Sequence, residues 1–324
     1  MAVKLADNIY ANVGKVPSRD GLGKGLLELG ETHPEVAVLC CDLKESTRVQ
    51  WFEEKYPDRY FEVGVAEQNM AGIAAGMASE GKIPFIASYA VFSPGRNWDQ
   101  IRVSICYSEY PVKIIGAHAG ISVGPDGATH QALEDIAIMR VLPNMTVLSP
   151  CDWLEAKKAT IHSLDIKGPV YFRLSRDKVP VITTEETPFK IGKAEVFRDG
   201  SDVTVVGSGQ LVYEALVAAK QLEKEGISVR VVNNHTIKPI DKAAIIAAAK
   251  ETGAIVTAEE HQIIGGLGSA VAEVLSENYP VPVKFVGVLD RFGESGPPDA
   301  LLEKFGLKSR DIVQKIREVM KMRK

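Results

Sequence analysis

The sequence predicts an α/β fold of two domains, each a mostly parallel sheet flanked by helices. Short apolar runs alternate with longer segments of helical spacing almost throughout the 324 residues. These runs are uniformly apolar, which is typical of parallel strands that are buried on both faces. At roughly 150 residues per domain, the length also indicates two such units.

The first domain is expected over residues 1–180. Its predicted strands are short β-branched or apolar runs at 36–41, 83–88, 112–117, 145–149 and 170–174. Its predicted helices lie between them, at 67–80, 95–107, 131–140 and 152–164. The order of strands and helices favours a parallel sheet that is covered on both faces.

A linker is expected at 181–192, because the surrounding stretch contains prolines and a Thr/Glu cluster without a clear period. The second domain is then expected over residues 193–324. Asp199-Gly200 lies between two apolar runs and predicts a hairpin there. The predicted strands that follow are 228–233, 254–259 and 283–288, and the predicted helices are 210–225, 241–250 and 266–278.

Composition and charge exclude several classes of protein. The net charge of -4 is less basic than is usual for a nucleic-acid binder. No apolar run approaches the roughly 20 residues that span a bilayer, and the N-terminus has no signal-peptide core, so a cytoplasmic protein is expected. The four cysteines form no C-x-x-C pattern, and Cys40 and Cys41 are predicted to be buried free thiols.

A polar cluster is predicted where the strand at 112–117 ends. His118 follows this strand directly, and His130 comes after a glycine-rich loop that also contains Asp126. Ligands of open α/β sheets bind outside the carboxyl ends of the strands. These side chains therefore form a candidate site for phosphate, hydroxyl or carbonyl groups, although Asp126-Gly127 as a turn and Thr129 as the cap of the helix at 131–140 explain them equally well.

Glu67 is a second candidate, at the start of a helix built from small residues that must pack closely against a neighbour. A carboxylate in a first helical turn is also favoured by the helix dipole alone. A dinucleotide site at the turn 207–209 is not favoured, because Val212 occupies the place of the third glycine of G-x-G-x-x-G.

Long strings around these residues resemble the transketolases. FEVGVAEQNMAGIAAGMASEGKIPFIASYAVF (61–92) and GAHAGISVGPDGATHQALEDIAIMRVLPNMTVLSPCD (116–152) resemble their pyrimidine-binding domain. NNHTIKPID (233–241), EEHQIIGGLGSAVAE (259–273) and RFGESG (291–296) resemble their C-terminal domain. Nothing in the chain resembles the GDG…N motif of the family's N-terminal diphosphate-binding domain. The chain thus looks like the C-terminal subunit of a split transketolase.

The resemblance implies thiamine diphosphate as the cofactor. It assigns Glu67 to the pyrimidine ring nitrogen, where a protonatable acceptor in a desolvated pocket is needed. It places Tyr89 and Phe92 against the pyrimidine and Asp42 close to the cofactor. Ser93-Pro94-Gly95 stands where full-length relatives carry a further aromatic residue. Mg²⁺ or Ca²⁺ would bridge the diphosphate, with ligands mainly from the partner subunit, so this chain is expected to supply no metal site.

For the substrate, the resemblance implies that hydroxyl, carbonyl and phosphate groups of sugar phosphates are bound by Arg19, Ser46, His118, Asp126, His130 and Arg176. Glu67, His118 and His130 are the expected catalytic residues. A guanidinium suits phosphate because it combines a fixed charge with a fork of donors. From composition alone, surface charge and turn formation would explain Arg19, Ser46 and Arg176.

The implied activity is transfer of a two-carbon ketol unit between ketose and aldose phosphates, as in the pentose phosphate pathway. It would require an N-terminal transketolase subunit, in a heterotetramer in which this chain forms a homodimer. Neither nucleic acid nor membrane is expected as a partner. The alternatives are a 1-deoxyxylulose-5-phosphate synthase-like subunit, a 2-oxo acid dehydrogenase E1 β subunit and a non-catalytic assembly subunit.

Overall fold

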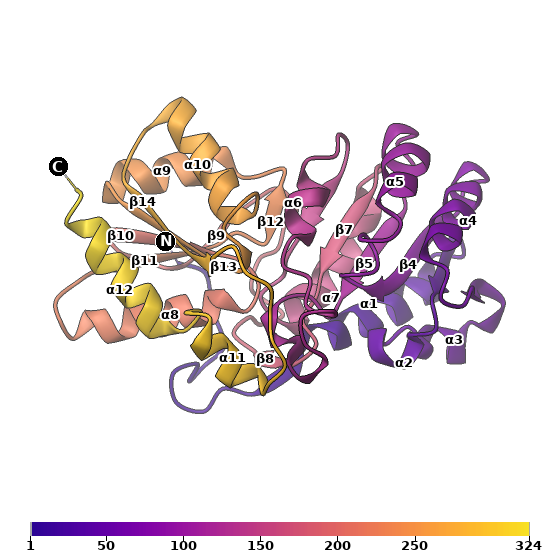
Figure 1. Cartoon of the computed structure of the whole chain (residues 1–324), viewed down its shortest axis with the longest axis horizontal. Coiled ribbons are helices and arrows are strands. Elements are labelled where there is room, and N and C mark those ends of the chain that lie inside the picture. The colour runs from indigo at the N-terminus through magenta and orange to yellow at the C-terminus, as the bar shows by residue number, and fades with distance from the viewer. Residues whose placement is uncertain (1, 324) are drawn as a thin grey trace.

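A seven-stranded sheet forms the centre of the N-terminal half of the chain in the computed structural model, which describes residues 2–323 (Figure 1). Its strand order is β12 (Thr236–Lys238), β6 (Thr146–Leu148), β7 (Val170–Arg173), β5 (Lys113–Ala117), β4 (Ile83–Tyr89), β2 (Val36–Cys40) and β3 (Tyr60–Glu62). All neighbours are parallel except β12 and β6. The carboxyl ends of β2, β4, β5 and β7 therefore meet at one edge.

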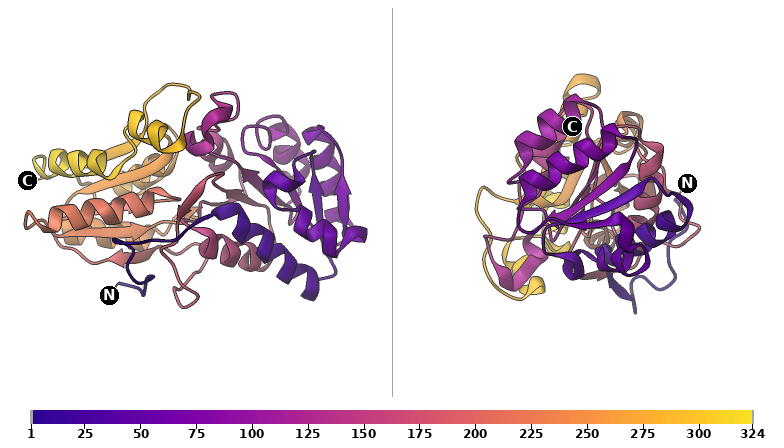
Figure 2. Two further views of the ribbon diagram at one scale, coloured as in Figure 1. Left: turned by 90° about the horizontal axis from the view of Figure 1, so that it is seen from below. Right: turned by 90° about the vertical axis from the view of Figure 1, so that its right-hand side faces the viewer.

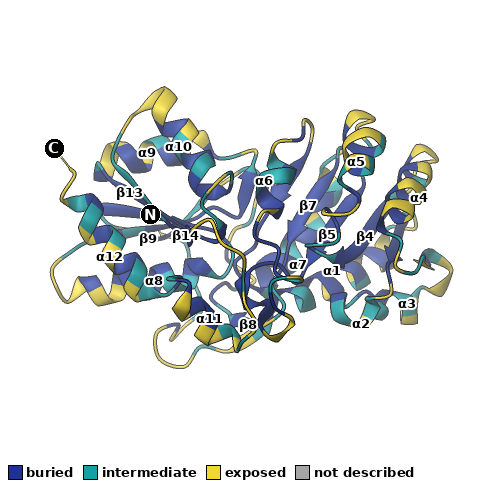
Figure 3. Cartoon of the chain, viewed as in Figure 1, coloured by how far each residue is buried: buried dark blue, intermediate teal, exposed yellow. Residues whose placement is uncertain are grey.

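Helices cover both faces of this sheet. One face packs on α1 (Ser18–Thr32), α3 (Gln50–Lys55) and α7 (Trp153–His162). The other packs on α4 (Glu67–Ser79), the π-helix η2 (Ile101–Tyr107) and α6 (Asp135–Arg140). The helix α4 buries positions three and four residues apart and exposes its other side, which is the pattern of an amphipathic helix (Figure 3).

Short elements connect these layers. They are β1 (Lys15–Pro17), α2 (Lys44–Thr47), η1 (Pro57–Arg59), α5 (Trp98–Gln100), η3 (Ile121–Asp126), η4 (Ser163–Asp165) and β8 (Lys178–Pro180). The strands β1 and β8 pair antiparallel and hold the start of α1 beside the chain that leaves β7.

The C-terminal half contains a five-stranded sheet. Its strand order is β14 (Val283–Val288), β13 (Ile255–Gln262), β10 (Val203–Gly207), β11 (Val229–Asn233) and β9 (Glu195–Arg198), with only β9 antiparallel. Its helices are α8 (Leu211–Glu223), α9 (Lys242–Thr252), α10 (Leu267–Asn278), α11 (Pro298–Lys304) and α12 (Ser309–Met320). The two mostly parallel sheets with flanking helices confirm the predicted fold class.

The two halves are joined by more than the connecting chain. The strand β12 belongs to the C-terminal half by sequence but pairs with β6 of the first sheet. The N-terminal segment runs along the second sheet (Figure 2), where the amide of Val3 donates to the carbonyl of Val196 and Ile9 is buried in the core. One hydrophobic cluster also spans both halves. The domain limits at 180 and 193 stay a prediction.

Three sequence-based expectations are wrong in detail. No hairpin forms at Asp199-Gly200, because β9 pairs with β11 and not with β10. The helix expected at 131–140 begins only at Asp135, because Gln131 and its neighbours run along the preceding loop and bond to it. The helix expected at 95–107 begins only at Trp98, and it continues from the short α5 directly into the π-helix η2.

The remaining predicted strands and helices lie at the expected places, with ends that differ by a few residues. All four cysteines are buried free thiols, as expected for Cys40 and Cys41. Within residues 2–323, no helix is both long and apolar enough to cross a membrane.

Candidate active site

Most of the expected site residues lie at the carboxyl edge of the first sheet. Tyr89 ends β4, Ser46 follows β2 in α2, and His118 directly follows β5. Glu67 begins α4 after the neighbouring β3. Because β2, β3, β4 and β5 are parallel neighbours, their following loops meet at this edge.

Glu67 is a buried carboxylate with one charged partner. Its side chain is 3% exposed, and both of its oxygens accept from Nη1 of Arg96, at 3.0 and 3.2 Å. The hydroxyl of Ser88 lies 3.5 Å from Oε1, and the amide of Asn97 donates to the Glu67 backbone carbonyl. Burial of an ionised carboxylate requires such a partner. The sequence alone does not indicate a role for Arg96. It directly follows Ser93-Pro94-Gly95, the segment that replaces an aromatic residue of full-length relatives.

Aromatic rings form a wall beside this carboxylate. The ring of Tyr89 stacks on His118 with centroids 4.1 Å apart and on Phe92 at 6.0 Å. His130 meets Phe92 edge-on at 5.3 Å and Tyr89 at 6.1 Å. These four side chains come from two segments, the end of β4 and the connection between β5 and α6, so the fold brings together the expected ring-binding and substrate-binding residues. Such a wall offers flat faces and excludes water.

His118 is held in a special backbone conformation. Its φ of 56° lies in the left-handed region, which few residues other than glycine adopt, and its side chain is 1% exposed. Its Nε2 lies 3.0 Å from Nη1 of Arg19. Since a guanidinium only donates, Nε2 accepts, and the proton of the neutral ring is on Nδ1. That Nδ1 is buried and has no partner among residues 2–323.

Positive charge surrounds His118. Burial lowers its pKa to about 2, and repulsion by Arg19, Arg176 and Arg48 acts in the same direction. Burial also lowers the pKa of Arg19, and the charges of Arg48 and Arg176 add to this effect. Of these three arginines, only Arg48 forms an ion pair within residues 2–323, with 2.7 Å between its Nε and Asp20. The imidazole is therefore neutral, and the surrounding cations favour an anion.

The remaining contacts order the loops around these arginines. Nη1 of Arg19 donates to the carbonyl of Ser46 at 2.7 Å, and the hydroxyl of Tyr89 donates to the Ser46 hydroxyl at 3.1 Å. Nη1 of Arg176 donates to the carbonyl of Val123 at 3.0 Å, in the loop that follows His118. Arg19, Ser46 and Tyr89 thus form one connected group with His118.

Asp42 and Asp126 lie outside these contacts. Both are exposed, and in the described part of the chain neither carboxylate has a hydrogen-bond partner. Asp42 follows β2 with a φ of 58°, and Asp126 ends η3. The structure therefore does not join these two carboxylates to the contacts among Arg19, Tyr89 and His118.

The loop 119–130 is held by the C-terminal half of the chain. Oε1 of Glu260 accepts from the amide of Ser122 at 2.5 Å, and its Oε2 accepts from Nε2 of Gln210. Nε2 of Gln131 donates to the carbonyl of Glu294 at 2.9 Å and to that of Ile121 at 3.1 Å. Sequence reasoning missed these positioning residues, because no local pattern indicates which distant side chain will face a loop.

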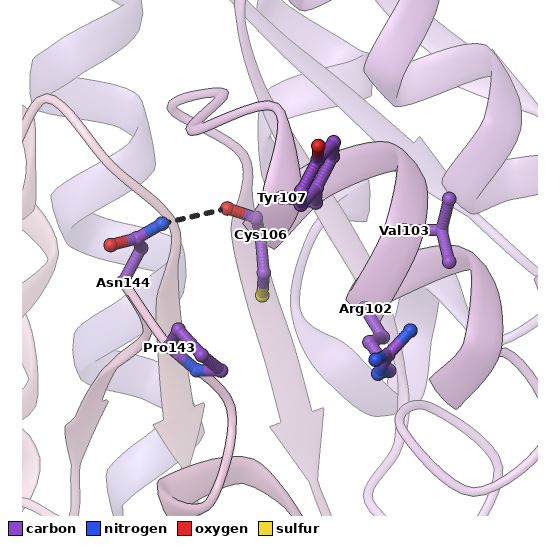
Figure 4. Close-up of a pocket in the computed structure, with 6 residues that line it drawn as sticks. All are labelled: Arg102, Val103, Cys106, Tyr107, Pro143 and Asn144. Atoms are coloured by element: carbon purple, nitrogen blue, oxygen red, sulfur yellow. Dashed lines mark hydrogen bonds between the residues drawn. The ribbon is translucent and has the colours of Figure 1, made fainter.

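A separate surface pocket of about 320 Å³ lies beside η2, away from these residues (Figure 4). Its lining residues are Arg102, Val103, Cys106, Tyr107, Pro143 and Asn144. Burial raises the pKa of Cys106 to about 12, so its thiol is protonated at neutral pH and a poor nucleophile. Within residues 2–323, no group of three or more His, Cys, Asp or Glu side chains is arranged to hold a metal ion.

Two family models match this chain. The transketolase pyrimidine binding domain matches residues 14–181, and the transketolase C-terminal domain matches residues 192–312. A putative transketolase C-terminal section from Methanocaldococcus jannaschii is 45% identical over 306 residues, which cover 94% of this chain and 96% of that protein. The 6-deoxy-6-sulfo-D-fructose transketolase subunit SqwH from Clostridium sp. (strain MSTE9) is 45% identical over 91% of both proteins.

A solved structure is similar over almost the same length. It is described as a split gene transketolase in an inactive β4 tetramer, with a TM-score of 0.90, 48% identity and coverage of 95% of this chain and 100% of that chain. Transketolase-like protein 2 from Mus musculus is 39% identical, and this chain spans 50% of its length. With both domains matched, this chain belongs to the transketolase family.

Proposed function

We propose that this chain is the C-terminal subunit of a two-subunit transketolase, which transfers a two-carbon ketol unit between ketose and aldose phosphates with thiamine diphosphate. The observation that carries the proposal is the buried carboxylate of Glu67 beside the wall of Tyr89, Phe92, His118 and His130. We further propose a cytoplasmic enzyme of sugar-phosphate metabolism such as the pentose phosphate pathway.

The residues present fit the pyrimidine part of the cofactor. Such a ring needs an acceptor for a proton on its ring nitrogen and an apolar face to stack on. Glu67 is 3% exposed and shares the partner Arg96 with Phe92, whose ring lies 6.0 Å from that of Tyr89. When bound, thiamine diphosphate supplies the nucleophilic carbon for cleavage and formation of the carbon–carbon bond.

Glu67 would share a proton with the pyrimidine ring nitrogen, while Phe92 holds the ring and excludes water. Asp42, after β2, would lie close to the cofactor. His118 is neutral, so it would hydrogen-bond a substrate oxygen without adding charge, and His130 would contact the same substrate. Glu67, His118 and His130 are the proposed catalytic residues.

The arginines would bind the terminal anion of the sugar. Arg19 and Arg176 are close enough to depress the pKa of His118, and no carboxylate pairs with either of them among residues 2–323. A tetrahedral phosphate would satisfy both, with Ser46 as a further donor. One relative is named a 6-deoxy-6-sulfo-D-fructose transketolase subunit, and another an apulose-4-phosphate transketolase subunit. Sugars with a sulfonate and sugars with a phosphate should therefore both be tested as substrates. Asp126 and His130 would contact sugar hydroxyls.

The proposed partner is an N-terminal transketolase subunit with the diphosphate-binding domain. It would supply most ligands of the Mg²⁺ or Ca²⁺ that bridges the diphosphate. The assembly would be a heterotetramer in which two copies of this chain form a dimer. The deoxyxylulose, 2-oxo acid and non-catalytic alternatives are not favoured, because the relatives that match over nearly the whole chain are transketolase sections or subunits.

The test is Glu67→Gln in the complex of this chain with its N-terminal partner. Glutamine keeps the shape but cannot exchange a proton, so ketol transfer should fall by at least about 100-fold. Thiamine diphosphate binding, measured by calorimetry, should persist. Glu80→Gln, at the exposed end of the same helix, is the matched control and should keep full activity. Near-wild-type turnover in Glu67→Gln would refute the assignment.

A further inference from the structure

The contacts of Arg96 with Glu67 and Phe92 have a specific geometry. Nη1 of Arg96 donates to both oxygens of the Glu67 carboxylate, at 3.0 and 3.2 Å. The guanidinium carbon lies 4.0 Å from the centroid of the Phe92 ring. One planar cation thus places N–H donors against the carboxylate and its flat face against the aromatic ring.

An aminopyrimidine would use the same two groups. It is also planar, it meets a carboxylate with N–H donors at its edge, and it stacks on an aromatic face. We propose that the Arg96 guanidinium occupies the place of the cofactor's pyrimidine on Glu67 and Phe92 in the cofactor-free chain and must leave when the cofactor binds. This inference rests on the proposed function, since it takes Glu67 and Phe92 as the pyrimidine site.

The structure explains why such an exchange is easy. The Arg96 side chain is 48% exposed, whereas Glu67 is 3% exposed. The arginine can therefore move into water by side-chain rotation, on a fast timescale. The backbone need not follow, because the amide of Arg96 donates to the carbonyl of Phe92 at 2.8 Å and Phe92 is held in turn by Tyr89.

The structure also explains why the exchange is needed. Without a cation, the buried Glu67 carboxylate would have no charged partner among residues 2–323. Arg96 pairs with the Glu67 carboxylate until the pyrimidine ring replaces it there. The apparent affinity for the cofactor is then reduced by the fraction of molecules in which Arg96 has left the carboxylate.

The test measures thiamine diphosphate binding by calorimetry in the complex with the N-terminal partner. Arg96→Ala should lower the dissociation constant by at least about threefold, because every molecule is then competent to bind. Arg102→Ala is the matched control, since Arg102 is an exposed arginine on η2 outside the site, and it should leave the affinity unchanged.

A second readout follows the association rate at rising cofactor concentration. Because Arg96 leaves fast, this rate should rise linearly in both proteins, with a slope in the wild-type complex that is at least about threefold lower than in Arg96→Ala. Unchanged or weaker binding by Arg96→Ala, beside normal binding by the wild type, would overturn the exchange and leave the proposed function intact. A wild-type complex that does not bind thiamine diphosphate would overturn both.

Discussion

The buried side chain of Glu155 should make the free energy of unfolding depend on pH. This glutamate of α7 is 1% exposed and connects the two halves of the chain. One oxygen accepts from the amide of Cys151 at 2.6 Å, and the other accepts from the side-chain amide of Asn233 at 2.6 Å. Burial, with the neighbouring charge of Asp152, raises the pKa of Glu155 from 4.5 to about 7.

The raised pKa makes stability depend on pH in a defined direction. Below pH 4.5 the group is protonated in the folded and unfolded chain alike. Between pH 4.5 and about 7 only the unfolded chain ionises, so the free energy of unfolding falls as the pH rises and levels off above about 7. At about 1.4 kcal/mol per pKa unit, the loss amounts to about 3 kcal/mol.

The variant Glu155→Gln should remove this loss. The glutamine oxygen can accept from the amide of Cys151. Its NH2 group can donate to Oδ1 of Asn233, if the side-chain amide of Asn233 flips. Among residues 2–323, this Oδ1 has no other partner. Urea unfolding followed by circular dichroism, from about pH 5 to pH 7.5, should show the wild type losing about 2–3 kcal/mol more than the variant.

The control is Glu54→Gln, a change at an exposed glutamate of α3. Its unfolding free energy should run parallel to the wild type over the same range. If Glu155→Gln also runs parallel to the wild type within about 0.5 kcal/mol, the assigned burial and charge of Glu155 are wrong.

Three further predictions concern the site and the thiols. Gly120→Ala should destabilise the chain by about 3 kcal/mol in urea unfolding, because φ is 87° and the new Cβ would clash with the carboxyl carbon of Glu260. Unchanged stability would contradict this geometry. The His118 imidazole should stay neutral, so its ring signals in NMR spectra should not shift between about pH 5 and pH 8, and a midpoint inside that range would refute its burial among cations. The four buried cysteines should react with a thiol reagent only in denaturant, and fast labelling of the native chain would contradict their burial.

The order of strands and helices in the first sheet could be predicted from local patterns. Mostly apolar runs such as 36–40 and 113–117 are buried parallel strands, because each must pack against helices on both faces. The pairing of β9 with β11, and of β12 with β6, could not be predicted, since long-range pairing leaves no local signal. The hairpin predicted at Asp199-Gly200 is wrong for this reason.

The candidate site could be predicted in part. The resemblance implied Tyr89, Phe92, His118 and His130, whose rings the structure brings together, and Glu67, which Arg96 links to the Phe92 ring. Contacts between distant residues, such as Arg96 with Glu67 or Glu260 with the loop after β5, depend on tertiary structure. Composition and spacing hold no information about them.

We expect this chain to need a partner subunit to complete a transketolase site. The most direct test measures ketol transfer from a ketose phosphate to an aldose phosphate, with thiamine diphosphate and Mg²⁺ present. The purified chain is assayed alone and after mixing with an N-terminal subunit that carries the diphosphate-binding motif. Transfer is expected only in the mixture, and turnover by the lone chain at the rate of the mixture would show that no partner is needed.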